Sequence, residues 1–286
     1  MARVEFFART EVGCTRERNE DTFISAKIAE RRRGLSADIR VQELDAASAL
    51  VAVCDGMGGA AAGDVAAAIA AEQLYETVLR YAPTMKNAQA IDGALLTGVQ
   101  NANRAIAEHA RQHPEKAGMG STMTAVYVGG PRVHIVHLGD SRAYLRRGRS
   151  LQQLTTDHSV VGQMIATGQL TPEQARSYEH RNVLLQALGV QPSCTPEVVQ
   201  LEVRSGDVML LCTDGLDGHL TDPQILDIML RHEDPVRCAR ALTEAACRAG
   251  GHDNTTVAVL RFVGEGLQMP VPGADLGLAR QAYQVN

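Results

Sequence analysis

The chain has 286 residues, of which 45% are apolar and 3% aromatic, so it can build a sizeable core packed mainly from aliphatic side chains. Its formal net charge of −5 gives no electrostatic reason to expect nucleic acid or an anionic membrane as a partner. Residues 1–9 lack a signal-peptide pattern, and no apolar run is long enough to span a membrane. We therefore predict a soluble protein of the cytoplasm.

The first half of the chain shows strand patterns followed by helix patterns. Apolar and β-branched runs predict strands over residues 4–8, 22–26 and 50–54. Residues 28–48 are polar and are predicted to form an irregular surface segment, with the basic triplet Arg31, Arg32 and Arg33 in a solvated loop. Apolar residues at helical spacing predict helices over residues 60–81 and 91–113, the second entered through Asp92.

The second half returns to strands, interrupted by a polar segment. Residues 121–128, 132–138 and 141–146 are predicted to form an antiparallel meander. Residues 155–188 are polar with short helical patches, one of them starting at Thr171-Pro172, and are predicted to form a lobe inserted between sheet strands. The remaining expected elements are strands at 197–203, 208–213 and 255–263 and helices at 221–230 and 235–249.

The organisation of the chain favours one domain. No repeat, low-complexity segment or linker divides residues 1–263. Residues 264–286 contain proline and glycine and few large apolar side chains, and we predict a loosely ordered C-terminal tail.

The cysteines show neither metal-binding nor redox spacing. No two of them form a C-x-x-C pair, and none is followed six positions later by arginine, as a cysteine-nucleophile phosphatase loop requires. We interpret the thiols as structural. They are Cys14, Cys54, Cys194, Cys212, Cys238 and Cys247.

Acidic residues next to glycine or asparagine stand at several predicted strand ends and turns. Each one alone is explained by the preference of aspartate for turns. If they converge, carboxylates about 4 Å apart repel one another by about 4 kcal/mol at an effective dielectric of ~20, and must share a proton or hold cations. A set of oxygen ligands without histidine or cysteine suits Mg²⁺ or Mn²⁺ better than zinc. The pairs are Glu20-Asp21, Asp55-Gly56, Gly139-Asp140, Asp214-Gly215 and Asp253-Asn254.

Six motifs in order resemble those of the type 2C (PPM-like) metal-dependent protein Ser/Thr phosphatases, bacterial branch, over about residues 3–263. The resemblance implies an α+β fold, a four-layer α-β-β-α sandwich of two antiparallel sheets flanked by helices. It places metals in a cleft at one end and makes residues 155–188 the flap beside it. The motifs are Arg16-x-x-Asn19-Glu20-Asp21, Asp55-Gly56-Met57-Gly58-Gly59, Met119-Gly120-Ser121-Thr122, Gly139-Asp140-Ser141-Arg142, Asp214-Gly215 and Gly251-x-Asp253-Asn254.

The resemblance implies two tightly bound Mn²⁺ or Mg²⁺ ions. Asp55 would bridge them, and the carbonyl group of Gly56 would bind the second ion. Asp214 and Asp253 would complete the ligand shell of the first. Catalysis would depend on these three aspartates and on Arg16.

Four further residues receive roles from the resemblance. Glu20 and Asp21 would hold metal-bound waters, and Asp140, with Asp214, would hold a weaker third ion. Arg16 would grip the substrate phosphate, because its planar guanidinium suits bidentate contact with phosphate oxygens. Two simpler alternatives stay open: a turn at Asp140 with an internal Asp–Arg pair, and a surface ion pair of Arg16 with Glu17 or Glu20.

One departure from animal relatives bears on the mechanism. Those relatives have a histidine after the Asp-Gly pair, proposed as the general acid, where this chain has Met57. A thioether cannot donate a proton, and we expect His158 and His252 to be flap and loop residues. We therefore expect a hydroxide bridging the two ions to attack phosphorus in line, and a metal-bound water to protonate the leaving oxygen.

The resemblance implies a phosphoric monoester hydrolase that acts on phosphoserine and phosphothreonine in proteins. Its partners would be phosphorylated proteins, including a bacterial Ser/Thr kinase and its substrates, and the enzyme would be a monomer. Two alternatives remain: a phosphatase of anti-anti-sigma regulators, and a catalytically silent member that acts as a binding or scaffold module. Silent members usually lose one of the metal-binding aspartates, and all are present here.

Overall fold

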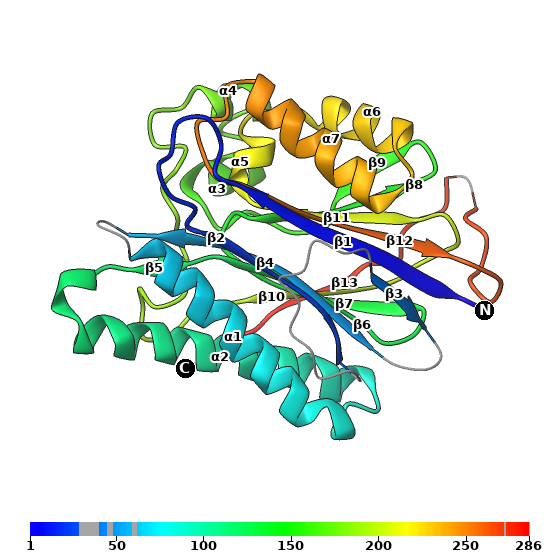
Figure 1. Cartoon of the computed structure of the whole chain (residues 1–286), viewed down its shortest axis with the longest axis horizontal. Coiled ribbons are helices and arrows are strands. Elements are labelled where there is room, and N and C mark those ends of the chain that lie inside the picture. Colours follow the sequence, from blue (N-terminus) through cyan, green and yellow to red (C-terminus); the bar gives the residue numbers. More distant parts are fainter. Residues whose placement is uncertain (29–39, 45–47, 59–61, 272, 286) are drawn as a thin grey trace.

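Two antiparallel sheets stack face to face, and helices cover the outer face of each (Figure 1). The structure is a computed structural model that describes residues 1–28, 40–44, 48–58, 62–271 and 273–285. The basic triplet at residues 31–33 lies outside the described residues, as does the last glycine of the Asp55–Gly59 motif.

The first sheet has the strand order β3-β1-β12-β11-β8-β9. Its strands are β1 (Arg3–Glu11), β3 (Arg40–Glu43), β8 (Arg142–Arg147), β9 (Ser150–Gln153), β11 (Val208–Cys212) and β12 (Thr255–Val263). The second sheet has the order β13-β10-β7-β6-β4-β2, with β5 paired to β4. Its strands are β2 (Asp21–Lys27), β4 (Ala49–Met57), β5 (Gly120–Ser121), β6 (Met123–Val128), β7 (Arg132–Leu138), β10 (Glu197–Glu202) and β13 (Ala279–Ala282).

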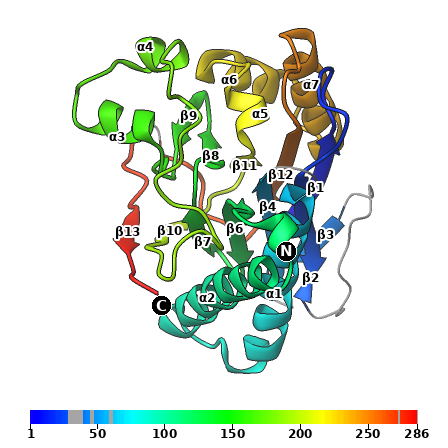
Figure 2. The ribbon, with the colours of Figure 1, turned by 90° about the vertical axis from the view of Figure 1, so that its left-hand side faces the viewer.

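The helices form two outer layers and part of the flap. Helices α1 (Gly63–Tyr81) and α2 (Ala88–Gln112) cover the second sheet, and α5 (Asp214–Asp217), α6 (Asp222–Arg231) and α7 (Pro235–Arg248) lie over the first (Figures 1 and 2). Helices α3 (Val160–Ala166) and α4 (Pro172–Arg176) lie in the flap, and short 3-10 turns follow α1 (Ala82–Thr84) and α2 (Pro114–Lys116). No helix among the described residues is both long and apolar enough to cross a bilayer.

Strand β4 shows why the sandwich has this layered form. Its side chains alternate between two apolar cores: Leu50, Ala52 and Cys54 face the helices α1 and α2, whereas Val51 and Val53 face the other sheet. Both sets are buried, because a strand in the middle of a sandwich is covered on its two faces. The strand predicted over residues 50–54 is confirmed.

The predicted meander at residues 121–146 is wrong in one respect. Strands β6 and β7 do pair as an antiparallel hairpin, but β8 pairs with β11 and β9 in the other sheet. The chain therefore crosses between the sheets at Gly139–Ser141, a change of sheet that strand patterning alone does not reveal. Asp140 therefore lies in the connection between the two sheets.

Two further expectations need correction. Helix α2 begins at Ala88 with Asn87 as its cap, so Asp92 lies inside the helix, where its buried side chain contacts His134 and Gln200. Within residues 28–48, predicted to be irregular, β3 pairs with β1. The rest of that segment, at 29–39 and 45–47, lies outside the described residues.

The C-terminal segment is more regular than the sequence suggests. Strand β13 pairs antiparallel with β10 at the edge of the second sheet (Figure 2). The Arg280 side chain donates to the carbonyl group of Leu154 (2.7 Å) and forms an ion pair with Glu197 (3.3 Å). The loosely ordered tail is thus a wrong expectation for residues 279–282, while a domain boundary at residue 263 stays a prediction.

Candidate metal centre

Asp55 stands near the end of β4 and is held by its backbone. Its N–H donates to Thr122 Oγ1 (2.9 Å), and its carbonyl accepts from the N–H of Thr122 (2.8 Å). In the sheet register, Asp21 of β2 lies opposite Asp55. Contacts on both sides therefore fix the direction in which the Asp55 carboxylate projects.

Asp21 joins the two sheets beneath this position. Its Oδ2 atom accepts hydrogen bonds from Thr213 Oγ1 (2.8 Å) and Thr256 Oγ1 (2.7 Å). Thr213 directly follows β11 and Thr256 lies in β12, and both strands belong to the first sheet. Its Oδ1 atom is buried without a hydrogen-bond partner among the described residues. Burial raises the pKa of Asp21 to about 7, although the two hydroxyl groups favour the charged form.

Gly56 is required by a close approach of three segments. A Cβ atom at this position would overlap the carbonyl oxygen of Gly63 and would also meet the backbone oxygen of Glu20. The N–H of Gly56 donates to that same Glu20 carbonyl (3.1 Å), and the Glu20 carboxylate accepts from the backbone N–H of Gly63. The start of α1 is therefore packed directly against the candidate site.

Asp214 and Asp253 approach from the other sheet. Asp214 is the first residue of α5, immediately after β11, and Asp253 lies two residues before β12. The turns that carry them touch, since a Cβ atom at Gly215 would overlap the carbonyl oxygen of Asn254. Residues separated by about forty positions are thus brought to the same end of the sandwich as Asp55.

The carboxylates of this end repel one another. Burial, together with Asp21, Asp214, Asp140 and Asp253, raises the pKa of Asp55 well above its usual range. Burial and Asp253 likewise raise the pKa of Asp214, partly opposed by a side-chain hydrogen bond between Asp214 and Asp55. Two carboxyl groups can share such a bond only if one of them holds a proton. The cluster therefore needs protons or cations to balance it.

Asp253 is bound differently from its neighbours. Its Oδ2 atom accepts from Arg16 Nη2 (2.8 Å), and its Oδ1 atom accepts from the N–H of Asn254 (2.9 Å). Across the described part of the chain, no three His, Cys, Asp or Glu side chains form a ready-made metal cage. We attribute this to Asp253, whose two oxygens are turned toward Arg16 and Asn254. The ion pair of Arg16 is therefore with Asp253, not with the alternatives Glu17 or Glu20.

Asp140 lies in the crossing between the sheets. Burial raises its pKa well above the usual range, and Asp214, Asp157 and Asp217 add to this effect. The next residue, Ser141, contacts Thr122 Oγ1 through its hydroxyl oxygen (2.7 Å), which connects this turn to the residue that holds Asp55. Asp140 and Asp55 thus belong to one connected framework.

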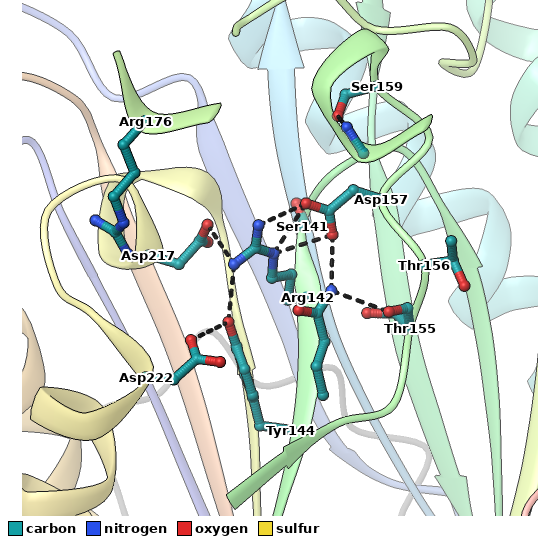
Figure 3. A network of polar contacts seen from close by, with 12 residues as sticks. Ser141, Arg142, Tyr144, Thr155, Thr156, Asp157, Ser159, Arg176, Asp217 and Asp222 are labelled. Carbon is teal, nitrogen blue, oxygen red and sulfur yellow. Dashed lines mark hydrogen bonds and ion pairs between the residues drawn. The ribbon is translucent and has the colours of Figure 1, made fainter. Parts of the chain in front are cut away.

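Arg142, considered above only as the partner of Asp140 in a turn, lies between two aspartates from other elements (Figure 3). Arg142 forms ion pairs with Asp157 (2.6 Å) and Asp217 (2.9 Å). The alternative of a turn with an internal Asp140–Arg142 ion pair therefore does not describe the partners of Arg142. Its partners stand 15 and 75 positions away in the chain, and no local motif announces them.

The two histidines considered as acids hold loops in place. His158 Nδ1 accepts from the N–H of Gly139 (3.2 Å), and burial lowers the pKa of this histidine. The His252 ring lies 5.6 Å from the ring of His219. His158 thus contacts the backbone of Gly139, and His252 contacts the ring of His219.

Cys14 and Cys247 form a disulfide between the loop that carries Arg16 and the end of α7. Their Cα atoms are 6.3 Å apart and their sequence separation is 233. Both residues are exposed, whereas the other four cysteines are free and buried. The interpretation as unpaired structural thiols is therefore wrong for this pair, whose large separation gave no signal in the sequence.

Comparison with known proteins decides the family. A family model described as protein phosphatase 2C matches residues 33–248. The chain belongs to the protein phosphatase 2C family. Serine/threonine protein phosphatase PstP of Mycobacterium tuberculosis is 35% identical to it over 267 residues, 92% of this chain and 46% of PstP. The phosphatase 2C chain thus spans about half the length of that relative. Serine/threonine phosphatase stp of Listeria monocytogenes is 33% identical over 73% of this chain and 82% of its own length.

Solved structures confirm the predicted fold of this phosphatase 2C chain. The crystal structure of M. tuberculosis PstP/Ppp covers 92% of the chain at 34% identity with a TM-score of 0.74, and all of that structure is covered. The catalytic domain of PstP in complex with two manganese ions matches with a TM-score of 0.72 at 32% identity, over 92% of this chain and 100% of that one. Stp1 from Staphylococcus aureus matches with a TM-score of 0.79 at 26% identity, over 91% of this chain and 95% of that one.

The residues of the phosphatase 2C chain fit divalent cations. All the candidate donors are oxygens, and Asp55, Asp140, Asp214 and Asp253 are only partly buried, so they remain accessible to ions. Burial and the neighbouring carboxylates raise the pKa values of Asp55 and Asp214, so a bound cation would favour their charged forms. Oxygen donors suit Mg²⁺ or Mn²⁺.

Proposed function

We propose that this chain is a metal-dependent protein phosphatase that hydrolyses phosphoserine and phosphothreonine in proteins. The observation that carries the proposal is the convergence of acidic side chains from distant elements: Asp55 lies near the end of β4 and Asp214 begins α5, and the charge of Asp214 adds to the burial that raises the pKa of Asp55. Strand β4 belongs to the second sheet, and α5 directly follows a strand of the first, in a chain of the phosphatase 2C family.

The residues that would hold the ions are Asp55, the carbonyl group of Gly56, Asp214 and Asp253. When bound, two divalent ions would lower the pKa of a water molecule, which makes it a nucleophile toward a phosphate ester at neutral pH. We assign Asp140 to a third, weaker ion. Manganese is the ion bound in the structure of the PstP catalytic domain, and manganese or magnesium is our proposal here.

Glu20 and Asp21 would orient water at the edges of this cluster. Burial raises the pKa of both carboxyl groups, so each can act as a hydrogen-bond acceptor or, when protonated, as a donor. Neither needs to touch an ion to do so.

Arg16 would bind the substrate phosphate. Its side chain is 49% exposed and already lies against the cluster through Asp253. A guanidinium group binds two phosphate oxygens in the same manner as two carboxylate oxygens. We propose that Arg16 contacts the phosphate when Asp253 serves as a metal ligand.

The leaving oxygen would take its proton from water. Met57 follows Gly56 where animal relatives have histidine, and its thioether has no proton to give. The contacts of His158 and His252 hold loops, so neither is assigned as the acid.

We also propose a cellular setting. The chain would act as a monomer in the cytoplasm and reverse the action of a bacterial Ser/Thr kinase on phosphorylated proteins. Relatives named Ser/Thr protein phosphatase or protein phosphatase, at 30–35% identity, support the choice of substrate class.

The test is the substitution Asp55→Ala. This variant should lose Mn²⁺-dependent release of phosphate from a phosphothreonine peptide and keep its circular-dichroism spectrum. Full activity of the variant, or of the unaltered chain in EDTA, would contradict the proposal. If the unaltered chain fails to hydrolyse p-nitrophenyl phosphate with Mn²⁺, the silent-scaffold alternative is correct. A strong preference for a phosphorylated anti-anti-sigma protein over phosphothreonine peptides would favour the other alternative.

A further inference from the structure

Arg142 connects two elements that flank the candidate site (Figure 3). It is the first residue of β8, and its side chain is only 19% exposed. One side of its guanidinium group contacts Asp157, where the chain enters the flap. The other side contacts Asp217, the last residue of α5. The side chains of both aspartates are 9% exposed.

The contact with Asp157 fixes the start of the flap. Arg142 Nε lies 2.9 Å from Oδ1 and Nη2 lies 2.6 Å from Oδ2, which is a bidentate pair. The next residue, His158, donates its backbone N–H to the carbonyl of Gly139 (2.7 Å). The returning arm of the flap is fastened at the same place, because the N–H of Leu185 donates to the carbonyl of His158 (2.8 Å).

The contact with Asp217 fixes α5. Arg142 Nη1 lies 2.9 Å from Asp217 Oδ2, and the helix that ends with Asp217 begins with Asp214. A second contact joins the flap to the segment that follows α5, since Arg176 of α4 donates to the carbonyl of Leu220 (2.9 Å). The flap and the helix that carries Asp214 are therefore joined through buried polar contacts.

We infer that Arg142 is a positioning residue that sets the flap relative to the metal centre. The inference rests on the proposed function and goes beyond it, because Arg142 would touch neither substrate nor ion. A phosphopeptide extends on both sides of its phosphate and must pass beside the flap, whereas p-nitrophenyl phosphate has no such extension. Loss of the bidentate pair should therefore weaken binding of a peptide more than binding of the small ester.

The chain offers a matched control at the other end of β8. Arg147 makes the same kind of bidentate pair with Asp207, at 3.0 Å from Nε to Oδ1 and 2.7 Å from Nη2 to Oδ2. The side chains are 10% and 1% exposed, so this pair is at least as buried. It joins β8 to the turn before β11 and does not contact the flap residues of the Arg142 network.

The experiment compares Arg142→Lys with Arg147→Lys. Lysine keeps the charge and removes the planar fork in both variants. With Mn²⁺, Arg142→Lys should raise KM for a phosphothreonine peptide about tenfold and change KM for p-nitrophenyl phosphate less than about twofold. Arg147→Lys should leave both KM values unchanged, even if it lowers the melting temperature. Trypsin should also cleave the flap faster in Arg142→Lys than in Arg147→Lys, a readout that needs no activity.

Two single-charge variants sharpen the test and replace Arg142→Lys if that protein fails to fold. Asp157→Asn should shift the peptide KM and the rate of tryptic cleavage of the flap as Arg142→Lys does. Asp217→Asn should instead raise the Mn²⁺ concentration needed for half-maximal activity equally for both substrates.

Identical KM values and identical cleavage of the flap in the Arg142 and Arg147 variants would overturn the inference. So would a proportional loss of activity on both substrates. An unaltered chain without phosphatase activity overturns the proposed function instead, and the cleavage rates still decide whether Arg142 holds the flap.

Discussion

Asp55 and Asp253 would serve the same ions, yet the fold holds them in different ways. Asp55 lies on a strand buried on both faces, with backbone hydrogen bonds to Thr122 and with Asp21 opposite it. Asp253 lies in a loop, and its carboxylate is held by Arg16, whose side chain is half exposed. One half of the site is thus preformed, and the other half is adjustable. This division suits a centre that must hold ions firmly and exchange a phosphate at each turnover.

The preformed half should tolerate the least change. Gly56→Ala should unfold the start of α1 or displace it, because the new Cβ atom would overlap the Gly63 carbonyl oxygen. We expect a loss of at least about 3 kcal/mol in the free energy of unfolding and no measurable activity. Gly93→Ala in α2 is the control, since nothing lies within 4 Å of its Cβ position. That variant should be stabilised by up to about 1 kcal/mol. Urea denaturation of both variants measures the difference, and a Gly56→Ala protein as stable as the parent contradicts the preformed half.

The loop that carries Arg16, in the adjustable half, is linked covalently to the end of α7. Reduction of the exposed Cys14–Cys247 disulfide should lower the free energy of unfolding by about 2–5 kcal/mol, because it frees a long loop in the unfolded chain. Melting temperatures with and without dithiothreitol measure this effect. The double variant Cys14→Ser, Cys247→Ser should melt like the reduced parent and should no longer respond to the reductant. A parent that melts at one temperature in both conditions excludes a stabilising disulfide.

Acid should loosen the preformed half. Thr122, which holds Asp55, contacts Ser141, and the carbonyl of Ser141 accepts from Thr124, the partner of the buried His137. Burial lowers the pKa of His137 to about 3 from the ordinary value of 6.5. Between these two values the unfolded chain binds a proton at His137 that the folded chain does not, so the contribution of this histidine to stability falls as the pH falls.

The size of this acid effect follows from the same shift. The loss begins below about pH 6.5 and approaches about 1.4 kcal/mol for each pH unit down to about pH 3. Urea denaturation between pH 7 and pH 4 measures the slope. The free energy of unfolding of the parent, measured relative to that of His137→Gln, should fall with this slope as the pH falls, and a constant difference between the two proteins would contradict the role of His137.

The smallest expected effect is on Arg16. Arg16→Ala should raise KM for a phosphothreonine peptide about tenfold and leave kcat nearly unchanged, because the adjustable half would lose a contact to the phosphate. Arg18→Ala, in the same exposed loop, is the control and should behave as the parent. A loss confined to kcat would show that Arg16 acts in the transition state and not in substrate binding.

The two halves also differ in how far the sequence predicts them. The strand that carries Asp55 was predictable, because a short apolar run that contains β-branched residues and ends in Asp-Gly favours a buried strand over a helix. The partners of Arg142 and the disulfide at Cys14 were not, since their contacts join residues 15 to 233 positions apart. The convergence of the aspartates was predicted only from the family resemblance, because strand patterns do not indicate which sheet each strand joins.

The same limit explains the errors in the fold. The strands at residues 121–146 were placed well, yet β8 belongs to the other sheet, since local patterning carries no information on that choice. Helix α2 begins at Ala88, before the apolar spacing is evident, because the Asn87 side chain accepts from the N–H of Ala90 (2.9 Å). The side chain of Asp92, expected at the helix start, is used to join α2 to β7 through His134.

Strand β13 has a practical consequence for anyone who shortens this chain. It occupies the outer edge of β10, so the backbone N–H and C=O groups along that edge are already paired. Cutting after residue 263 would expose those groups, and open edges invite pairing between molecules. The shortened protein would then be prone to self-association through this open edge, and it would also lose the contact of Arg280 with Leu154 at the start of the flap.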